Sequence, residues 1–311
     1  MNEVKLRGLV AAAHTPFNGA GALNLGIVEK QAAHYLANGI HTAFIGGSTG
    51  ESHSLTLDER RALAVRWFEV VRGTALRIVV HVGSNCLADA RALAAQAEQF
   101  GAIAISALAP SYFKPNSVAR LVESCAEIAA AAPNTPFYFY DIPGLTGIHL
   151  SMPEFLEQAA DRIPTLRGIK FTNSDLMSFQ RCLRADNGAF DIPYGTDEWL
   201  LAALALGAEG AVGSSYNFAA PIYQRLIAAF RKGDLEAARE EQFHSVQLIT
   251  LLASYGYMGA AKATMQMLGV DVGPARLPNG SLTEAQSEKL RSELETLGFF
   301  GWISKGALQP A

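Results

Sequence analysis

The segment Gly168-Ile169-Lys170-Phe171-Thr172 has the pattern of a short buried β-strand, and the same pattern recurs along much of the chain. Its β-branched and aromatic side chains are typical of a strand covered on both faces. A lysine interrupts the apolar run. Because an ammonium group is costly to bury, an unpaired lysine here loses its proton more easily and can attack a carbonyl group as a neutral amine. The alternative is that Lys170 pairs with an acid or extends out of the strand end.

Similar apolar runs alternate with segments of helical length. The sequence contains eight strand candidates, at Leu9–Ala12, Thr42–Ile45, Ile78–His81, Ile103–Ala107, Phe137–Tyr140, Gly168–Phe171, Asp191–Tyr194 and Gly210–Val212. Eight β-α alternations predict an α/β fold of the closed (β/α)8 TIM barrel type over residues 1–232. An open, doubly wound sheet is the alternative, but the absence of a G-x-G-x-x-G turn favours the barrel.

Beyond residue 232 the sequence predicts only helices, at Asp234–Ser254, Ala260–Leu268 and Leu282–Thr296. We expect this C-terminal helical extension, residues 233–311, to pack on the barrel because it has too little core of its own. Capping-box motifs predict further helix starts at Thr56–Glu59, Ser151–Glu154 and Thr283–Gln286.

The composition is that of a compact globular enzyme, with 50% hydrophobic and 17% charged residues, and it excludes disorder. The net charge of −4 gives no reason to expect a nucleic acid partner. The three cysteines lack metal-ligand spacing and favour a reducing compartment. Residues 1–7 have no long apolar core, so we expect no signal peptide and no membrane anchor, and a cytoplasmic protein.

In a barrel, functional residues gather at the C-terminal ends of the strands. The second strand is followed by Gly46-Gly47-Ser48-Thr49-Gly50-Glu51, where small residues and two hydroxyl groups could hold a carboxylate through backbone N–H groups. The alternative is an ordinary tight turn. In the fifth strand Tyr138 and Tyr140 share a face, and Tyr140, nearer the mouth, could transfer a proton or simply line the barrel.

Polar residues also follow the last three strands. Thr172 lies on the same face of its strand as Lys170. Asp197 and Glu198 come shortly after Gly195, and Ser214 lies in a small hydroxyl-rich turn. The two acids could cap a helix or bind sugar hydroxyl groups. The histidines form no H-x-H or H-x-x-x-H pair, and His81 is the one placed at a strand end. These residues together favour carbonyl chemistry on a 2-oxo acid over metal chemistry.

Four motifs carry a resemblance to a known family: Gly46-Gly47-Ser48-Thr49-Gly50-Glu51, Tyr140-Asp141-Ile142-Pro143, Gly168-Ile169-Lys170 and Gly210-Ala211-Val212-Gly213-Ser214. From Leu9 to about Pro278 the chain resembles the dihydrodipicolinate synthase and N-acetylneuraminate lyase family of class I pyruvate aldolases. The resemblance implies a barrel with a helical extension, a homotetramer, and no metal or organic cofactor.

The resemblance also implies roles for single residues. Lys170 would form a Schiff base with C2 of a 2-oxo acid, and Tyr140 would transfer a proton. Ser48 and Thr49 would hold the carboxylate. Tyr112 matches a tyrosine that reaches into a neighbouring subunit's site, where it and Ser48 would complete a proton relay.

Substrate choice within the family depends on a few further positions. Leu145 occupies the position of an arginine that binds a second carboxylate in the synthases, and an apolar side chain cannot make that contact. In the lyases the residues that match Thr172, Gly195, Asp197, Glu198 and Ser214 bind the sugar chain. Asp141 and Thr196 depart from the residues usual in the lyases, which leaves the exact sugar open.

The function implied by this resemblance is reversible cleavage of N-acetylneuraminate to pyruvate and N-acetylmannosamine. The alternative within the class is another pyruvate aldolase, acting on a 2-keto-3-deoxy sugar acid or as a dihydrodipicolinate synthase. A hypothesis from a different class is a non-catalytic barrel that binds a 2-oxo acid or sugar acid, but the presence of both Lys170 and Tyr140 argues against it.

Overall fold

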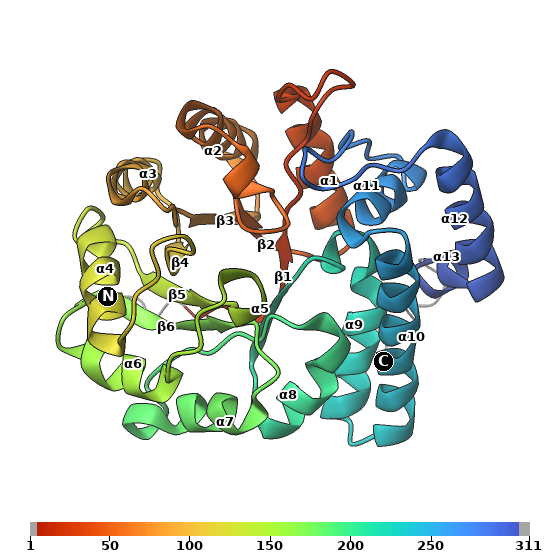
Figure 1. Cartoon of the computed structure of the whole chain (residues 1–311). Helices are drawn as coiled ribbons and strands as arrows, with labels where there is room; N and C mark the ends of the chain where they lie inside the picture. Colours follow the sequence, from red (N-terminus) through yellow and green to blue (C-terminus); the bar gives the residue numbers. More distant parts are fainter. Residues whose placement is uncertain (1–4, 305–311) are drawn as a thin grey trace.

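A computed structural model of the chain describes residues 5–304, so the ends of the predicted barrel and extension, residues 1–4 and 305–311, lie outside the described range. The core of the fold is one parallel sheet of seven strands in the order β6-β5-β4-β3-β2-β1-β7. The strands are β1 Gly8–Ala12, β2 Thr42–Ile45, β3 Arg77–His81, β4 Ala104–Leu108, β5 Phe137–Asp141, β6 Leu166–Phe171 and β7 Gly210–Gly213. Helices surround this sheet, as expected for a TIM barrel (Figure 1).

The predicted seventh strand, Asp191–Tyr194, is not a continuous strand, and that prediction is wrong. Pro193 has no N–H group and interrupts the ladder. The segment still bonds to both neighbours: Phe171 N donates to Pro193 O at 2.9 Å, and Tyr194 N donates to Gly210 O at 2.9 Å. Single parallel bridges therefore connect it to β6 and β7 and close the ring.

Most helices follow the strands in alternation and cover the outside of the ring. They are α1 Val28–Ala37, α2 Leu57–Val71, α3 Leu87–Gln99, α4 Val118–Ala129, α6 Met152–Ala160, α7 Leu176–Arg184, α8 Leu200–Leu206 and α9 Tyr216–Arg231. The short helix α5 Pro143–Thr146, between β5 and α6, lies over the end of the barrel instead (Figure 1). The extension comprises α10 Leu235–Ser254, α11 Tyr257–Met267, α12 Glu284–Leu297 and α13 Phe299–Trp302. Figure 1 shows α10 beside α9, and Leu248, Leu252 and Met265 belong to the same buried cluster as the barrel side chains. The division of the chain between residues 232 and 233 stays a prediction.

Two of the three predicted capping boxes are present. At Thr56 and Thr283 the hydroxyl accepts from the third helical N–H, and the side chain of Glu59 or Gln286 accepts from the cap N–H. At Ser151 only half of the motif forms. Ser151 Oγ accepts from Glu154 N, but the Glu154 carboxylate accepts from Gln158 Nε2 instead.

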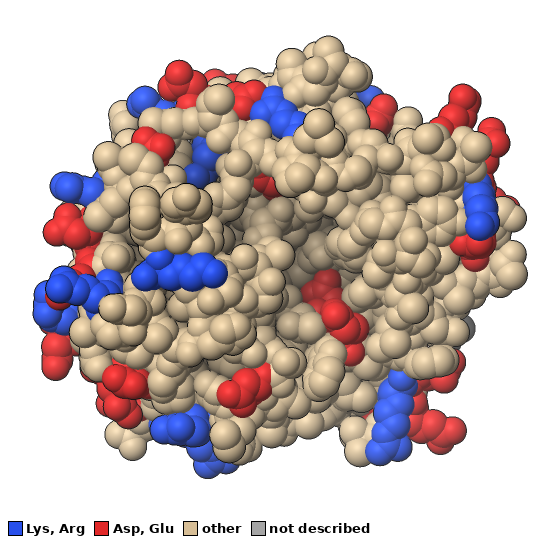
Figure 2. All heavy atoms as spheres, in the orientation of Figure 1, with Lys and Arg blue, Asp and Glu red and all other residues tan. Residues whose placement is uncertain are grey.

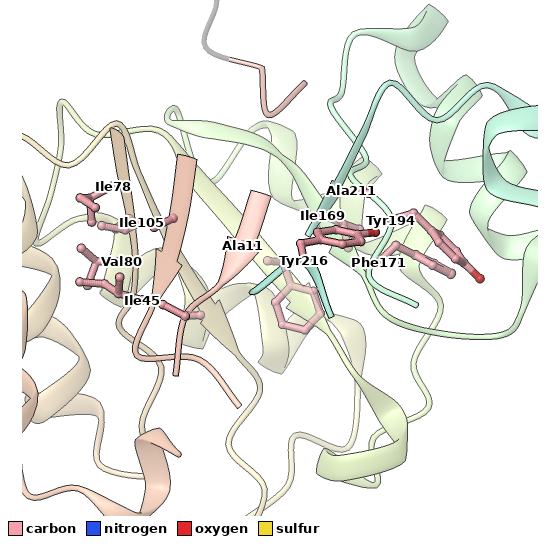
Figure 3. Close-up of a cluster of buried hydrophobic side chains, with 14 of the residues drawn as sticks. Ala11, Ile45, Ile78, Val80, Ile105, Ile169, Phe171, Tyr194, Ala211 and Tyr216 are labelled. Carbon is pink, nitrogen blue, oxygen red and sulfur yellow. The ribbon is translucent and has the colours of Figure 1, made fainter. Parts of the chain in front are cut away.

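Alternation along the strands sorts the buried side chains into two sets. One set lies between the sheet and the helices and includes Ile78, Val80, Ile169 and Phe171 (Figure 3). The other fills the inside of the barrel: Val10, Ala12, Phe44, Val79, Ala104, Leu108, Tyr138, Tyr140 and Val212. Because Lys170 stands between Ile169 and Phe171, its side chain points into the barrel.

Candidate active site

A cavity of about 720 Å³ lies at the C-terminal ends of the strands. Residues after β2, β4, β5, β6 and β7 line it, together with residues of the C-terminal extension. Figure 2 shows this face hollowed near the centre of the ring, with acidic side chains beside the hollow. The cavity is therefore in the place where the barrel fold predicts a functional site.

Lys170 reaches this cavity from inside the barrel and is only 4% exposed. Its Nζ lies 3.8 Å from the centroid of the Tyr140 ring and 4.3 Å from that of Phe44. Among residues 5–304, no Asp or Glu oxygen lies within 4.0 Å of this amine. Lys170 is thus neither paired with an acid nor extended into bulk solvent, and its amine faces the cavity.

Tyr138 and Tyr140 share the inner face of β5 but lie at different depths. Tyr140 is the register partner of Lys170 and lines the cavity, with its ring centroid 5.9 Å from that of His81. Tyr138 lies deeper, and its hydroxyl donates to Asp191 Oδ2 at 2.7 Å. Burial and the Asp191 carboxylate raise the pKa of Tyr138. Of these two tyrosines, Tyr140 is the one that reaches the cavity.

The glycine-rich loop after β2 carries Ser48 and Thr49 to the cavity wall. Gly46 has φ 65°, which favours glycine, and a Cβ on Gly47 would lie 2.6 Å from the Phe44 ring. His81 Nε2 accepts from Leu108 N at 3.3 Å, so its Nδ1 carries the proton and donates to Gly46 O at 2.9 Å. Burial, with the nearby Arg60, holds the pKa of His81 well below its usual range. His81 therefore supports the loop as a neutral side chain.

The residues that follow the last strands meet on another part of the cavity wall. Thr172, Gly195 and Ser214 line the main cavity, and they also line an adjoining hollow of about 250 Å³ together with Asp197 and Glu198. A Cβ on Gly195 would lie 1.8 Å from Thr172 Oγ1, so only glycine fits there. The structure thus brings together all five residues predicted to bind the sugar chain, which we call the sugar-side residues: Thr172, Gly195, Asp197, Glu198 and Ser214.

Asp197 is buried and caps no helix with its side chain. Its Oδ2 accepts from the backbone N–H of Ser215 at 2.9 Å and from the Ser215 hydroxyl at 2.5 Å. Burial raises the pKa of this carboxyl to about 6. No lysine, arginine or histidine of the described chain lies within 4.0 Å to compensate its charge.

Tyr112 is not brought into the cavity of its own chain. It is 79% exposed beside Phe113, which is 86% exposed, while the neighbouring Ser111 lines the cavity. The part of Tyr112 in a neighbouring subunit's site stays a prediction.

Several residues of the cavity wall were missed by sequence reasoning. Tyr257 and Met258 of α11 and Asn279 of the following loop line the cavity, and the Tyr257 hydroxyl lies 2.7 Å from Ser214 Oγ. No strand-end motif marks these residues, because they reach the site through the docking of the extension. Leu145 lies at the mouth, and no arginine from residues 5–304 lines the cavity.

Neither a metal site nor a membrane-spanning helix is found among residues 5–304. Within residues 5–304, no three His, Cys, Asp or Glu side chains gather in a way that could hold a metal ion. The predicted absence of a cofactor itself stays a prediction. In the same range, every helix is too short or too polar to cross a bilayer.

Comparison with known proteins gives consistent results. Residues 5–297 match the model of the dihydrodipicolinate synthetase family. N-acetylneuraminate lyase A of Xenopus laevis is 42% identical over 278 residues, which cover 88% of this chain and 90% of the relative. Solved structures of N-acetylneuraminate lyases from Aliivibrio salmonicida and Proteus mirabilis superpose with TM-scores of 0.92 at 42% and 40% identity. Each match covers 95% of this chain, and 98% and 100% of the other chain.

Proposed function

The chain belongs to the dihydrodipicolinate synthetase family, and from that premise we propose that it is a lyase that reversibly cleaves N-acetylneuraminate to pyruvate and N-acetylmannosamine. One observation carries the proposal: Lys170 is buried at the cavity, 3.8 Å from the Tyr140 ring, with no carboxylate of the described chain paired to it. Such an amine is suited to attack a ketone. The similarity to proteins named N-acetylneuraminate lyase supports the choice of substrate.

The reaction begins when the Lys170 amine adds to the C2 ketone of the open-chain sugar acid and water leaves. The resulting iminium is positively charged, and the rings of Phe44 and Tyr140 lie within 4.3 Å of the nitrogen that carries this charge. Aromatic faces attract cations, so they stabilise the iminium in the buried site. Ser48 and Thr49 bind the adjacent carboxylate.

Carbon–carbon cleavage follows from the iminium. The C4 hydroxyl gives its proton to the Tyr140 oxygen while Tyr140 passes its own hydroxyl proton to Ser48, the C3–C4 bond breaks, and its electrons pass to the iminium to form an enamine. The new aldehyde is N-acetylmannosamine. Protonation of C3 and addition of water then release pyruvate and restore the Lys170 amine. Ser48, with Tyr112 from a neighbouring subunit, completes the path of the proton.

The wall formed by Thr172, Gly195, Asp197, Glu198 and Ser214 binds the hydroxyl-bearing part of the sugar. Tyr257 extends this wall, since its hydroxyl lies 2.7 Å from Ser214 Oγ. The lack of an arginine on the cavity wall among residues 5–304 disfavours a substrate with a second carboxylate. A synthase that makes a dicarboxylic product is therefore not favoured.

We also propose that the protein is cytoplasmic and a homotetramer. The free thiols of Cys86, Cys125 and Cys182 support a reducing compartment. The exposed rings of Tyr112 and Phe113, beside the cavity mouth, support burial against another subunit. Light scattering of the purified protein tests the assembly, and the mass of a monomer would contradict it.

The function is tested by following pyruvate release from N-acetylneuraminate and, separately, from shorter 2-keto-3-deoxy sugar acids. Turnover of N-acetylneuraminate supports the lyase. Turnover of only the shorter acids would replace this substrate while keeping the aldolase chemistry. Binding of a sugar acid without any pyruvate release would favour the non-catalytic barrel.

A further inference from the structure

The glycine-rich loop is attached to the C-terminal extension through Glu51, its last residue. Glu51 has φ 52°, a left-handed conformation that costs a residue with a side chain about 1–3 kcal/mol unless its surroundings hold it. In this conformation Glu51 N donates to Ser48 O at 3.0 Å, and Ser52 N donates to Gly47 O at 3.2 Å. The backbone of Ser48 and Thr49 therefore depends on the position of Glu51.

The Glu51 side chain is held by three residues from far along the chain, one of which is Asn279, whose Nδ2 donates to Oε2 at 3.4 Å. Its Oε1 lies 2.8 Å from Lys262 Nζ of α11, and Oε2 accepts from Arg276 N at 2.8 Å. The side chains of Lys262 and Glu51 are 1% and 0% exposed, so the ion pair is shielded from water.

Lys262 binds more than the carboxylate. Its Nζ donates to Thr15 O at 3.0 Å and to Pro274 O at 2.8 Å. Thr15 in turn donates from Oγ1 to Gly50 O at 2.6 Å, inside the glycine-rich loop. One ammonium group thus connects the loop after β1, the loop after β2 and the segment after α11.

Stability alone is a weak reason for this arrangement. A buried ion pair often contributes no more to stability than a well-packed apolar pair, whereas conformational specificity is a recognised use of buried charges. We propose that Lys262 is a positioning residue of the active site: through Glu51 it fixes the loop so that Ser48 and Thr49 bind the carboxylate of the 2-oxo acid. This role rests on the proposed function, because it assumes that Lys170 forms a Schiff base with pyruvate.

The test measures the pyruvate concentration that gives half-maximal trapping of the reduced adduct with borohydride. Lys262→Met keeps the length of the side chain and removes its charge. We expect the half-maximal pyruvate concentration to rise by about tenfold or more, because a small displacement of binding groups has a large effect on a reacting complex. Methyl pyruvate lacks the carboxylate charge, so its half-maximal concentration should stay unchanged.

Glu51→Gln separates positioning from simple electrostatics. It preserves the side-chain shape and the acceptor for Arg276 N but weakens the contact with Lys262. Removal of a negative charge would by itself tighten pyruvate binding, whereas loss of positioning weakens it. The double variant, Glu51→Gln with Lys262→Met, restores the charge balance, so it should unfold closer to the unchanged protein while still binding pyruvate weakly.

A matched control is Arg225→Met, which breaks a half-buried ion pair with Glu241 between α9 and α10, 2.5 Å long. It should lower thermal stability and leave both half-maximal concentrations unchanged. The positioning role is wrong if pyruvate and methyl pyruvate weaken together in the Lys262 and Glu51 variants, or if neither changes. If the methionine variants do not fold, the half-maximal concentrations of pyruvate and methyl pyruvate for Glu51→Gln alone test the positioning role. Failure of the unchanged protein to trap any pyruvate would instead refute the proposed function.

Discussion

Two buried lysines, Lys170 and Lys262, both lie against aromatic rings but differ in the acceptors around them. Lys262, in the extension, is 2% exposed, forms an ion pair with the Glu51 carboxylate and donates to two carbonyl groups. Lys170, in the barrel mouth, is 4% exposed and has the rings of Phe44 and Tyr140 as neighbours. Its amine donates no hydrogen bond within residues 5–304. The first surroundings hold an ammonium ion in place, and the second leave an amine open to a ligand.

Burial alone therefore does not identify a reactive lysine. Both lysines follow small or apolar residues in sequence, in Gly168-Ile169-Lys170 and in Ala260-Ala261-Lys262. What separates them is the presence of acceptors supplied by distant segments: Thr15, Glu51 and Pro274 converge on Lys262, whereas no acceptor from residues 5–304 converges on Lys170.

Replacement of Lys170 by alanine should have the largest effect. Because the covalent intermediate cannot form, we expect pyruvate release from N-acetylneuraminate to fall by more than about 10⁴-fold. The variant should unfold at the same or a higher temperature, since it removes a buried amine that has no acceptor. Residual turnover close to that of the unchanged protein would show that Lys170 is not the nucleophile.

The two tyrosines of β5 extend the contrast to hydroxyl groups. Tyr140→Phe should lower kcat by about 10²- to 10⁴-fold, as expected for a lost proton transfer, and leave stability almost unchanged. Tyr138→Phe should leave kcat almost unchanged and lower the unfolding free energy by about 1–3 kcal/mol, because it removes a donor to the buried Asp191 carboxylate. Rate assays and urea unfolding of both variants check the pair. Equal loss of activity in both would contradict it.

Substitution of each lysine by methionine compares the two sites by stability alone. Lys262→Met leaves the Glu51 carboxylate buried without a counter-charge, so we expect a loss of about 3–5 kcal/mol in unfolding free energy. Lys170→Met should be neutral or stabilising. Equal losses of unfolding free energy for both variants would show that the contacts of Lys262 do not stabilise the protein more than those of Lys170.

A smaller effect is expected on the pH dependence of stability. The Glu51 carboxylate forms an ion pair with Lys262, whereas the Asp197 carboxylate has no ion-pair partner among residues 5–304. Burial raises the pKa of Asp197 from an ordinary 3.8 to about 6, so between these values the folded protein binds more protons than the unfolded chain. Its contribution to unfolding free energy therefore falls as the pH rises from about 4 to about 6. Asp197→Asn should reduce this slope, measured by urea unfolding across the range. An unchanged slope would contradict the assignment.

Much of the fold could be predicted from the sequence because the signals are local. Short apolar runs alternate with helices, and seven of the eight predicted strands are confirmed within two residues at each end. The exception, Asp191–Tyr194, has the composition of a strand, but Pro193 removes one N–H group from the ladder. The segment keeps its place in the ring through the neighbouring bonds.

The site was predictable where it lies at strand ends. Lys170, Tyr140, Ser48 and Thr49 reach the cavity, as do Thr172, Gly195 and Ser214, because a barrel brings all strand ends to one face. A role in sugar binding is implied only by the family resemblance and stays a prediction. Tyr257 and Lys262 could not be found in this way. Their roles depend on how the extension docks, and an ordinary helical pattern in α11 carries no signal of that docking.

The proposed function requires that Lys170 is the amine that bonds to the 2-oxo acid. The most direct measurement is to reduce the protein with borohydride in the presence of pyruvate, digest it, and map the modified lysine by mass spectrometry. We expect one reduced pyruvyl group, on the peptide that contains Lys170, and no label on the peptide that contains Lys262. An adduct on another lysine, or pyruvate release from N-acetylneuraminate without any adduct, would contradict it.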